Sequence, residues 1–118
     1  MPAIDVLASN RGQSRTVTVQ VKGEARRGGW QTSVTRGARR DPEDASVRFW
    51  ILVDLRQVTP LYYVMPEWWI QNDIFETHAA YRHGARRSGG SDSMHHGIAT
   101  SRVEQWSDRW DLLGIFDD

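Results

Sequence analysis

Five consecutive apolar residues (FWILV, 49–53) stand in the middle of the segment 47–55. Successive side chains of a strand point to opposite faces of a sheet, so an apolar run without alternation has to be covered on both sides. We therefore predict a central strand here, with one layer of structure on each face. The run is far shorter than the roughly 20 residues that a helix needs to cross a bilayer, so no membrane contact is expected.

The N-terminal part of the chain predicts a β-hairpin. Residues 3–8 (AIDVLA) are strand-like, turn-forming residues follow, and residues 15–22 (RTVTVQVK) alternate strictly between apolar and polar side chains. The alternation places the valines on one face and Gln20 and Lys22 on the other. A six-residue turn brings Asp5 opposite Gln20 and Lys22, on the same face.

Strands come first in the chain and helices last, which predicts an α+β fold. At 118 residues the chain is long enough for one domain, whose core we place at about 3–83. We expect a mixed sheet of four or five strands flanked by two helices. Beyond the segments above, the predicted elements are a strand over 30–34, a strand over 61–65, a helix from Pro66 to a stop at Gly84, a mobile loop over 84–97 and a C-terminal helix over about 101–114. Ile70 and Ile74 belong to the predicted inner stripe of the first helix, and Ser101 with Glu104 forms a predicted capping box at the start of the second.

The formal net charge is zero, but basic residues are concentrated near the N-terminus. Residues 1–40 hold eight basic and two acidic residues, whereas residues 41–118 hold seven basic and thirteen acidic ones. A basic face of this kind suits non-specific contact with the phosphate groups of DNA. The candidate arginines are Arg26, Arg27, Arg36, Arg39 and Arg40. The alternative interpretation is a solvated loop whose arginines contact nothing.

The chain contains no cysteine, which excludes a disulfide scaffold and a zinc–thiolate site. The spacing of the four histidines fits no metal site either. Residues 1–20 lack the pattern of a signal peptide. These observations predict a cytoplasmic protein.

Asp5, Gln20 and Lys22 together suit metal-dependent phosphodiester cleavage. A carboxylate and further oxygen ligands hold Mg²⁺, the ion makes hydroxide available near neutral pH, and a lysine stabilises the charge that develops on the phosphate. Lys22 is the single lysine among fifteen basic residues, as expected where a compact ammonium is required. The alternative is the polar face of an ordinary strand, with Asp5 paired to Arg15 across the hairpin.

The pattern around these residues resembles the PD-(D/E)XK, or restriction-endonuclease-like, nuclease superfamily. The resemblance extends over roughly residues 3–83. The matching pieces are the Asp5 hairpin, VQVK at 19–22, Trp30, FWILVDL at 49–55 and YYVMP at 62–66 leading into a helix.

The resemblance implies a role for each matching residue. Asp5 matches the metal-binding aspartate, Gln20 the second ligand position, the backbone carbonyl of Val21 a third ligand, and Lys22 the catalytic lysine. The implied cofactor is Mg²⁺ or Mn²⁺, and the implied substrate is DNA.

The chain departs from the family at two points. Gln20 is neutral where a carboxylate is usual. The family also places a helix carrying a glutamate before the hairpin, whereas only four residues precede Asp5. Three alternatives therefore stay open: the chain is N-terminally truncated, a partner chain supplies the helix, or the domain no longer cuts DNA. Glu24 is a candidate replacement for the missing glutamate.

We expect a metal-dependent DNA endonuclease or DNA-processing nuclease domain. One alternative is a catalytically inactive nuclease-like domain that serves as a protein- or nucleic-acid-interaction module. Another is a small toxin or immunity-type module. Trp68 and Trp69 are adjacent at the start of a predicted helix, so one ring should face outward. An exposed ring of this kind predicts a homo-oligomer, most simply a dimer.

Overall fold

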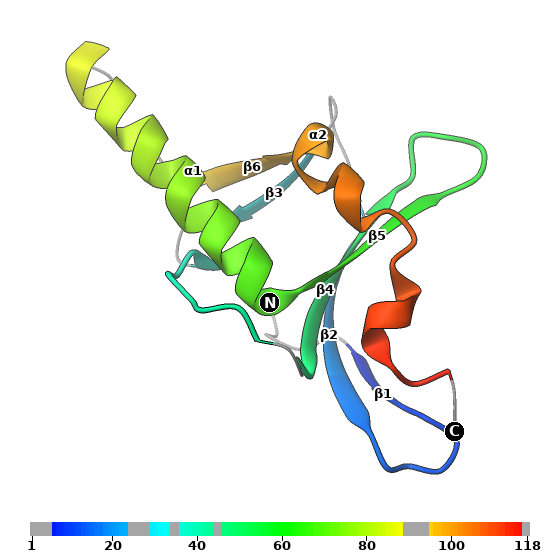
Figure 1. Ribbon diagram of the computed structural model, residues 1–118. Coiled ribbons are helices and arrows are strands. Elements are labelled where there is room, and N and C mark those ends of the chain that lie inside the picture. The colour runs from blue at the N-terminus through cyan, green and yellow to red at the C-terminus, as the bar shows by residue number, and fades with distance from the viewer. Residues whose placement is uncertain (1–5, 24–28, 34–35, 44–45, 89–94, 117–118) are drawn as a thin grey trace.

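The computed structural model describes residues 6–23, 29–33, 36–43, 46–88 and 95–116 (Figure 1). Four strands form a mixed sheet in the order β1-β2-β4-β5, in which β2 and β4 are parallel and the other neighbours antiparallel. Two more strands, β3 and β6, form an antiparallel ribbon. The predicted α+β class and four-stranded mixed sheet are confirmed. The elements are β1 (Val6–Ser9), β2 (Thr16–Lys22), β3 (Gly29–Ser33), β4 (Arg48–Asp54), β5 (Leu61–Pro66), α1 (Glu67–Ser88), β6 (His95–Ala99) and α2 (Thr100–Val103).

Both faces of the four-stranded sheet are covered, as the apolar run in β4 predicts. Side chains on one face of β4 join a cluster beneath α1, and those on the other face join a cluster beneath the C-terminal segment. The first cluster, the helix-side core, contains Trp30, Trp50, Leu52, Tyr63, Met65, Ile70, Ile74, Ile98 and Val103. The second, the tail-side core, contains Val17, Val19, Phe49, Ile51, Val64 and Leu113.

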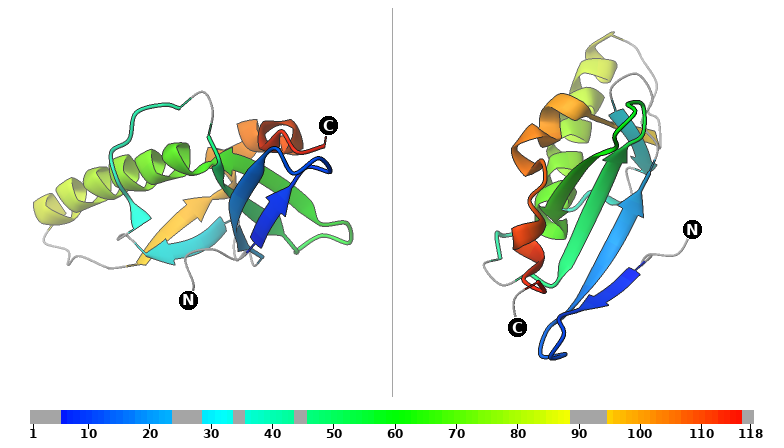
Figure 2. Two further views of the ribbon diagram at one scale, coloured as in Figure 1. Left: turned by 90° about the horizontal axis from the view of Figure 1, so that it is seen from below. Right: turned by 90° about the vertical axis from the view of Figure 1, so that its right-hand side faces the viewer.

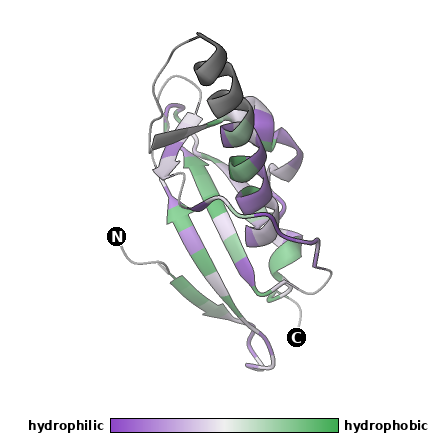
Figure 3. Cartoon of the chain, turned by 90° about the vertical axis from the view of Figure 1, so that its left-hand side faces the viewer, coloured by the Kyte–Doolittle hydropathy of each residue, from purple (hydrophilic) through white to green (hydrophobic). Residues whose placement is uncertain are grey.

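Strand β2 follows the predicted alternation. Val17 and Val19 are buried in the tail-side core. Gln20 pairs with Trp50 in the parallel register, so its side chain lies on the helix-side face. Figure 3 shows the same pattern as bands of hydrophobic and hydrophilic colour along the strands.

Helix α1 lies beside the β3–β6 ribbon (Figure 2) and buries Ile70 and Ile74 in the helix-side core. These two residues belong to the inner stripe expected from the sequence. Trp30 of β3 ties the ribbon to the main sheet, because its indole Nε1 donates a 3.0 Å hydrogen bond to the carbonyl oxygen of Val53. None of the helices in the described ranges is long and apolar enough to cross a membrane.

The predicted mobile loop over 84–97 is wrong at both of its described ends. Helix α1 passes Gly84 and ends at Ser88, and β6 begins at His95. A glycine inside a helix costs only about 1 kcal/mol relative to alanine, which the rest of a long helix can offset. Strand β6 forms because its backbone pairs with β3, in a register that places Ile98 opposite Trp30. Its polar sequence gives no local sign of this pairing.

The predicted helix over 101–114 is also wrong. The segment consists of α2, a 3₁₀ turn η2 (Glu104–Trp106) and a second 3₁₀ turn η3 (Trp110–Leu113). The expected capping box at Ser101 is not formed, since Ala99 is the N-cap residue and no side chain caps the helix. Asp108, with φ of 52°, interrupts the helical path.

The reason for the break lies in where the apolar residues of this segment pack. Val103 and Trp106 contact the helix-side core, whereas Trp110 and Leu113 contact the tail-side core. The chain passes from one face of the sheet to the other at Ser107, which forms a β-bridge with Tyr63 of the edge strand β5. A straight helix would present all four residues on one side, so it could not pack them against both faces of the sheet.

Candidate functional site

Gln20 and Lys22 lie on the helix-side face of β2, two positions apart. They pair in register with Trp50 and Leu52 of the neighbouring strand. Gln20 is 4% exposed, and Lys22 is half-buried. The Lys22 ammonium nitrogen lies 6.0 Å from the centroid of the Trp50 ring, at the outer limit of a cation–π contact. The sheet thus holds both side chains on one surface, above a rigid aromatic ring.

Three predicted site residues, Asp5, Arg26 and Arg27, lie outside the described residues, as does Glu24. The described register between β1 and β2 ends with Val6 opposite Val19. Asp5 is the next residue toward the N-terminus. Its pairing with Gln20 therefore stays a prediction.

A pocket of about 90 Å³ opens beside Gln20 on the same face of the sheet. We call it the Gln20 pocket. The residues that line it are Thr18, Val19, Gln20, Arg36, Arg48, Phe49, Trp50 and Glu67. Lys22 is not among them. A second pocket of about 120 Å³ shares Arg48 and Glu67 with the first, and Arg40 and Trp68 are among its other lining residues.

The segment that carries the predicted phosphate-binding arginines is fixed to helix α1. The backbone N–H of Ala38 donates to the carbonyl oxygen of Gln71 at 3.0 Å. The backbone N–H of Arg40 donates to Asn72 Oδ1 at 2.8 Å. Gly37 lies against the helix so closely that an added Cβ would come within 3.0 Å of the backbone nitrogen of Phe75. These contacts hold the arginines at defined positions beside the sheet.

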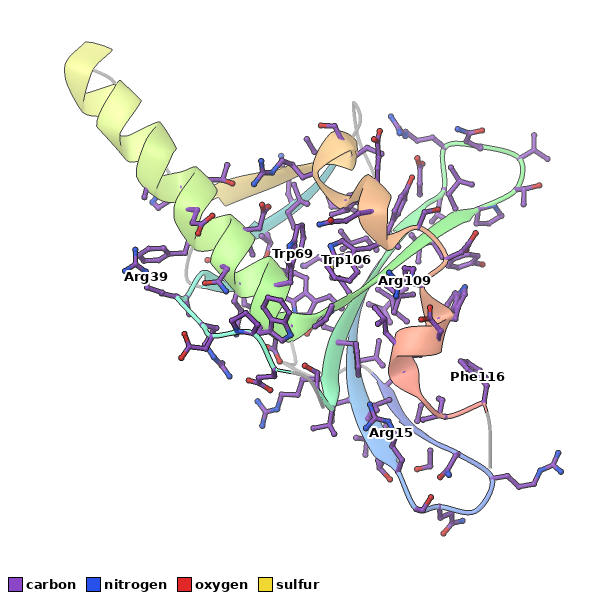
Figure 4. All side chains as sticks on the ribbon, viewed as in Figure 1. Arg15, Arg39, Trp69, Trp106, Arg109 and Phe116 are labelled. Atoms are coloured by element: carbon purple, nitrogen blue, oxygen red, sulfur yellow. The ribbon has the colours of Figure 1, made fainter. Side chains whose placement is uncertain are left out.

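The three described arginines of this segment have different surroundings. Arg36 lines the Gln20 pocket. The Arg40 guanidinium donates to Gln71 Oε1 and to Glu43 Oε1. The Arg39 guanidinium carbon lies 5.6 Å from the centroid of the Phe75 ring, on the outer side of α1 (Figure 4). Only Arg36 of these three is placed beside a predicted metal-ligand position.

Two residues of this pocket, Arg48 and Glu67, are not among the site residues predicted from the sequence. Arg48 pairs in register with Thr18, two positions before Gln20, so it occupies the same sheet face. Glu67 is the first residue of α1 and follows β5 directly. The alternation within β4, which puts Arg48 on the face of Trp50, would have placed Arg48 once the strand pairing was known.

Asp54, the last residue of β4, is a buried carboxylate near this site. It is 1% exposed, and both of its oxygens accept hydrogen bonds from Arg56. These bonds lower the pKa of Asp54 to about 2. The contacts with Arg56 fix the Asp54 side chain at the end of the strand.

Of the side chains predicted to bind magnesium, the described residues include Gln20. They contain no group of three histidine, aspartate or glutamate side chains that could hold a metal ion. Gln20 makes other interactions, but its Oε1 atom is buried and receives no hydrogen bond from the described residues. An amide oxygen suits Mg²⁺, which prefers oxygen ligands. The carboxylate that the ion also requires would come from Asp5.

The two adjacent tryptophans do not supply the exposed ring that motivated the predicted oligomer. Trp68 and Trp69 are both half-buried. The Trp69 ring packs edge-on against Trp106, with centroids 5.4 Å apart (Figure 4). Trp68 lines the second pocket. The oligomeric state stays a prediction.

Comparisons with known proteins give no assignment of their own. No family model matches the chain, and no curated protein or solved structure is significantly similar to it.

Proposed function

We propose that the chain is a metal-dependent nuclease domain that hydrolyses phosphodiester bonds of DNA. The observation that carries the proposal is the placement of Gln20 and Lys22 on one face of β2, beside a pocket lined by two arginines. The strand is the one whose VQVK sequence resembles the metal- and phosphate-binding strand of the PD-(D/E)XK nucleases.

Each residue has a distinct task in this proposal. Asp5, Gln20 and the backbone carbonyl of Val21 would hold Mg²⁺ or Mn²⁺, which supplies a polarised phosphate and hydroxide near neutral pH. Lys22 orients the attacking water and stabilises the extra negative charge on the phosphate in the transition state. The Lys22 ammonium lies 6.0 Å from the centroid of the Trp50 ring, so an aromatic surface lies beside the proposed catalytic group.

The test is cleavage of supercoiled plasmid DNA by the purified protein. Nicking should require Mg²⁺ or Mn²⁺ and stop with EDTA. Lys22→Ala should abolish it, and so should Lys22→Arg, because a planar, permanently charged guanidinium does not replace a compact ammonium. Arg109→Gln is the matched control, since Arg109 forms an exposed ion pair with Asp111 in the C-terminal segment. Full cleavage by folded Lys22→Ala would overturn the proposal.

A second candidate is a catalytically inactive nuclease-like domain that binds a protein or a nucleic acid. The neutral amide of Gln20, where the related nucleases usually carry a carboxylate, favours it. Both proposals are compatible with a homo-oligomer, or with a partner chain that supplies a further helix. A cytoplasmic location also stays a proposal, based on the absence of cysteine.

A further inference from the structure

We propose that the Gln20 pocket holds a phosphate group of a nucleic-acid strand, with Arg36 and Arg48 as its two cationic ligands. The inference rests on the proposed function, because it assumes that a nucleic-acid strand passes the cleavage site at Gln20 and Lys22. It assigns the substrate's neighbouring phosphate to two residues outside the metal site.

Two arginines reach this pocket from different parts of the chain. Arg48 is the first residue of β4 and pairs with Thr18 on the sheet face that carries Gln20. Arg36 belongs to the segment that hydrogen-bonds to α1 through Ala38 and Arg40. Both arginines line one cavity of about 90 Å³. A single water needs only roughly 10–15 Å³ by the same kind of measure, so a larger polar group fits.

The charges in the pocket are not balanced within the described part of the chain. Four arginines elsewhere in the described part of the chain form ion pairs: Arg40 with Glu43, Arg56 with Asp54, Arg102 with Asp73 and Arg109 with Asp111. Among the described residues, neither Arg36 nor Arg48 forms such a pair.

Glu67 is the acidic residue that lines the same pocket. Its carboxylate accepts a hydrogen bond from Gln71 Nε2 at 3.3 Å and is ion-paired with neither arginine within the described ranges. Two guanidiniums and one carboxylate leave a net positive charge. Planar guanidiniums are well suited to bind the oxygens of a phosphate. A phosphate bound by Arg36 and Arg48 would balance this charge.

The position of the pocket matches its proposed role. Along β2, the helix-side face carries Lys22, then Gln20, then Thr18, with about 7 Å between successive side chains. Lys22 and Gln20 belong to the proposed cleavage site, and the pocket is lined by Gln20 and Thr18. A nucleic-acid strand has a phosphate at every nucleotide. A nucleic-acid strand whose scissile phosphate lies beside Gln20 and Lys22 would therefore place the adjacent phosphate in the pocket.

The experiment measures binding of a fluorescein-labelled DNA duplex by anisotropy, in EDTA, over a range of salt concentrations. Each arginine that contacts a phosphate contributes about one unit to the slope of log affinity against log salt. Arg36→Gln and Arg48→Gln should each weaken binding about tenfold and reduce the slope by about one unit. Glu67→Gln should strengthen binding, because it removes a negative charge from the pocket. Arg109→Gln should leave affinity and slope unchanged.

The outcomes separate this inference from the proposed function. Normal slopes in both Arg36→Gln and Arg48→Gln, or no binding by the natural protein, would overturn the phosphate pocket. Reduced slopes without any metal-dependent cleavage would leave the pocket standing and overturn the nuclease. Inorganic phosphate is the second probe. If it displaces the duplex at concentrations equal to those of an unlabelled duplex, the pocket binds free phosphate and the assignment to a strand is wrong.

Discussion

The side chain of Arg15 donates a hydrogen bond of 2.7 Å from Nε to the carbonyl oxygen of Leu113, 98 residues further along the chain. A second bond of 2.7 Å runs from Arg15 Nη2 to the carbonyl oxygen of Ser46. One guanidinium thus joins the N-terminal hairpin, the residues before β4 and the C-terminal turn (Figure 4). The alternative pairing of Arg15 with Asp5 involves a residue outside the described ranges, so it stays a prediction; the described partners of the Arg15 side chain are these two backbone carbonyls.

Arg15→Gln should lower the free energy of unfolding. The substitution removes two charge-assisted hydrogen bonds to backbone carbonyls, and bonds to a charged group contribute about 1.5–3 kcal/mol each after compensation by water. We expect a loss of about 3 kcal/mol, measured by urea denaturation. Arg109→Gln, which breaks an exposed ion pair, should change stability by less than about 1 kcal/mol. Equal losses in the two variants would contradict this account.

Gly114→Ala should also destabilise the fold. Gly114 has a φ of 64°, and an added Cβ would lie 2.9 Å from Arg15 Nε. The left-handed conformation costs an alanine about 1–2 kcal/mol, and displacement of Arg15 adds to this cost. Gly12→Ala is the matched control, because a Cβ there has no heavy atom within 4 Å. A melting temperature for Gly114→Ala equal to that of Gly12→Ala would show that the turn adapts.

Acid stability should depend on Asp54. Its pKa is about 2 in the folded protein, against an ordinary value of 3.8, because Arg56 donates hydrogen bonds to the carboxylate. A lowered folded-state pKa gives a contribution that is complete above pH 4 and is lost as the pH falls toward 2. We expect about 1–2 kcal/mol, since the Arg56 side chain is 40% exposed and partly screened.

The measurement is the urea midpoint of the natural protein and of Asp54→Asn from pH 2 to pH 7. The difference between them should be largest near neutral pH and shrink between pH 4 and pH 2. A difference that is constant across the range would mean that the carboxylate contributes through packing and not through its charge.

Gln20→Glu should strengthen metal binding. The substitution adds a charged oxygen ligand at the position where the nucleases that the sequence resembles usually carry one. Calorimetry with Mn²⁺ should show tighter binding than in the natural protein, while Gln57→Glu, in the exposed loop between β4 and β5, should not. If neither the natural protein nor Gln20→Glu binds Mg²⁺ or Mn²⁺, the active-enzyme proposal fails and the inactive-domain alternative replaces it.

The parts of the fold that local patterns specify were predictable. The unbroken run that includes Phe49 and Ile51 predicted a strand buried on both faces, and Ile70 and Ile74 predicted the buried stripe of α1. In these cases one or two turns of helix, or a few residues of strand, contain the whole signal. The shared face of Gln20 and Lys22 follows from the same two-residue period.

The parts that depend on distant partners were not predictable. Strand β6 exists through its pairing with β3, and its residues have no apolar alternation of their own. The four apolar residues from Val103 to Leu113 have helical spacing, but two of them pack on each face of the sheet. Arg48 entered the candidate site only through its register with Thr18, and register between strands is not visible in one strand's sequence.

The bridge between Ser107 and Tyr63 has a consequence for how the molecule can associate. A backbone hydrogen bond of 2.9 Å from Asp108 N–H to the Tyr62 carbonyl also lies at this border of the sheet, so the C-terminal segment occupies the outer side of β5. Within the described chain, β1 is then the border of the sheet that is left without a strand neighbour. If two copies paired through their β1 edge strands, neither β1 strand would remain open for further pairing. Extension of the four-stranded sheet through β1 would therefore be complete in a pair.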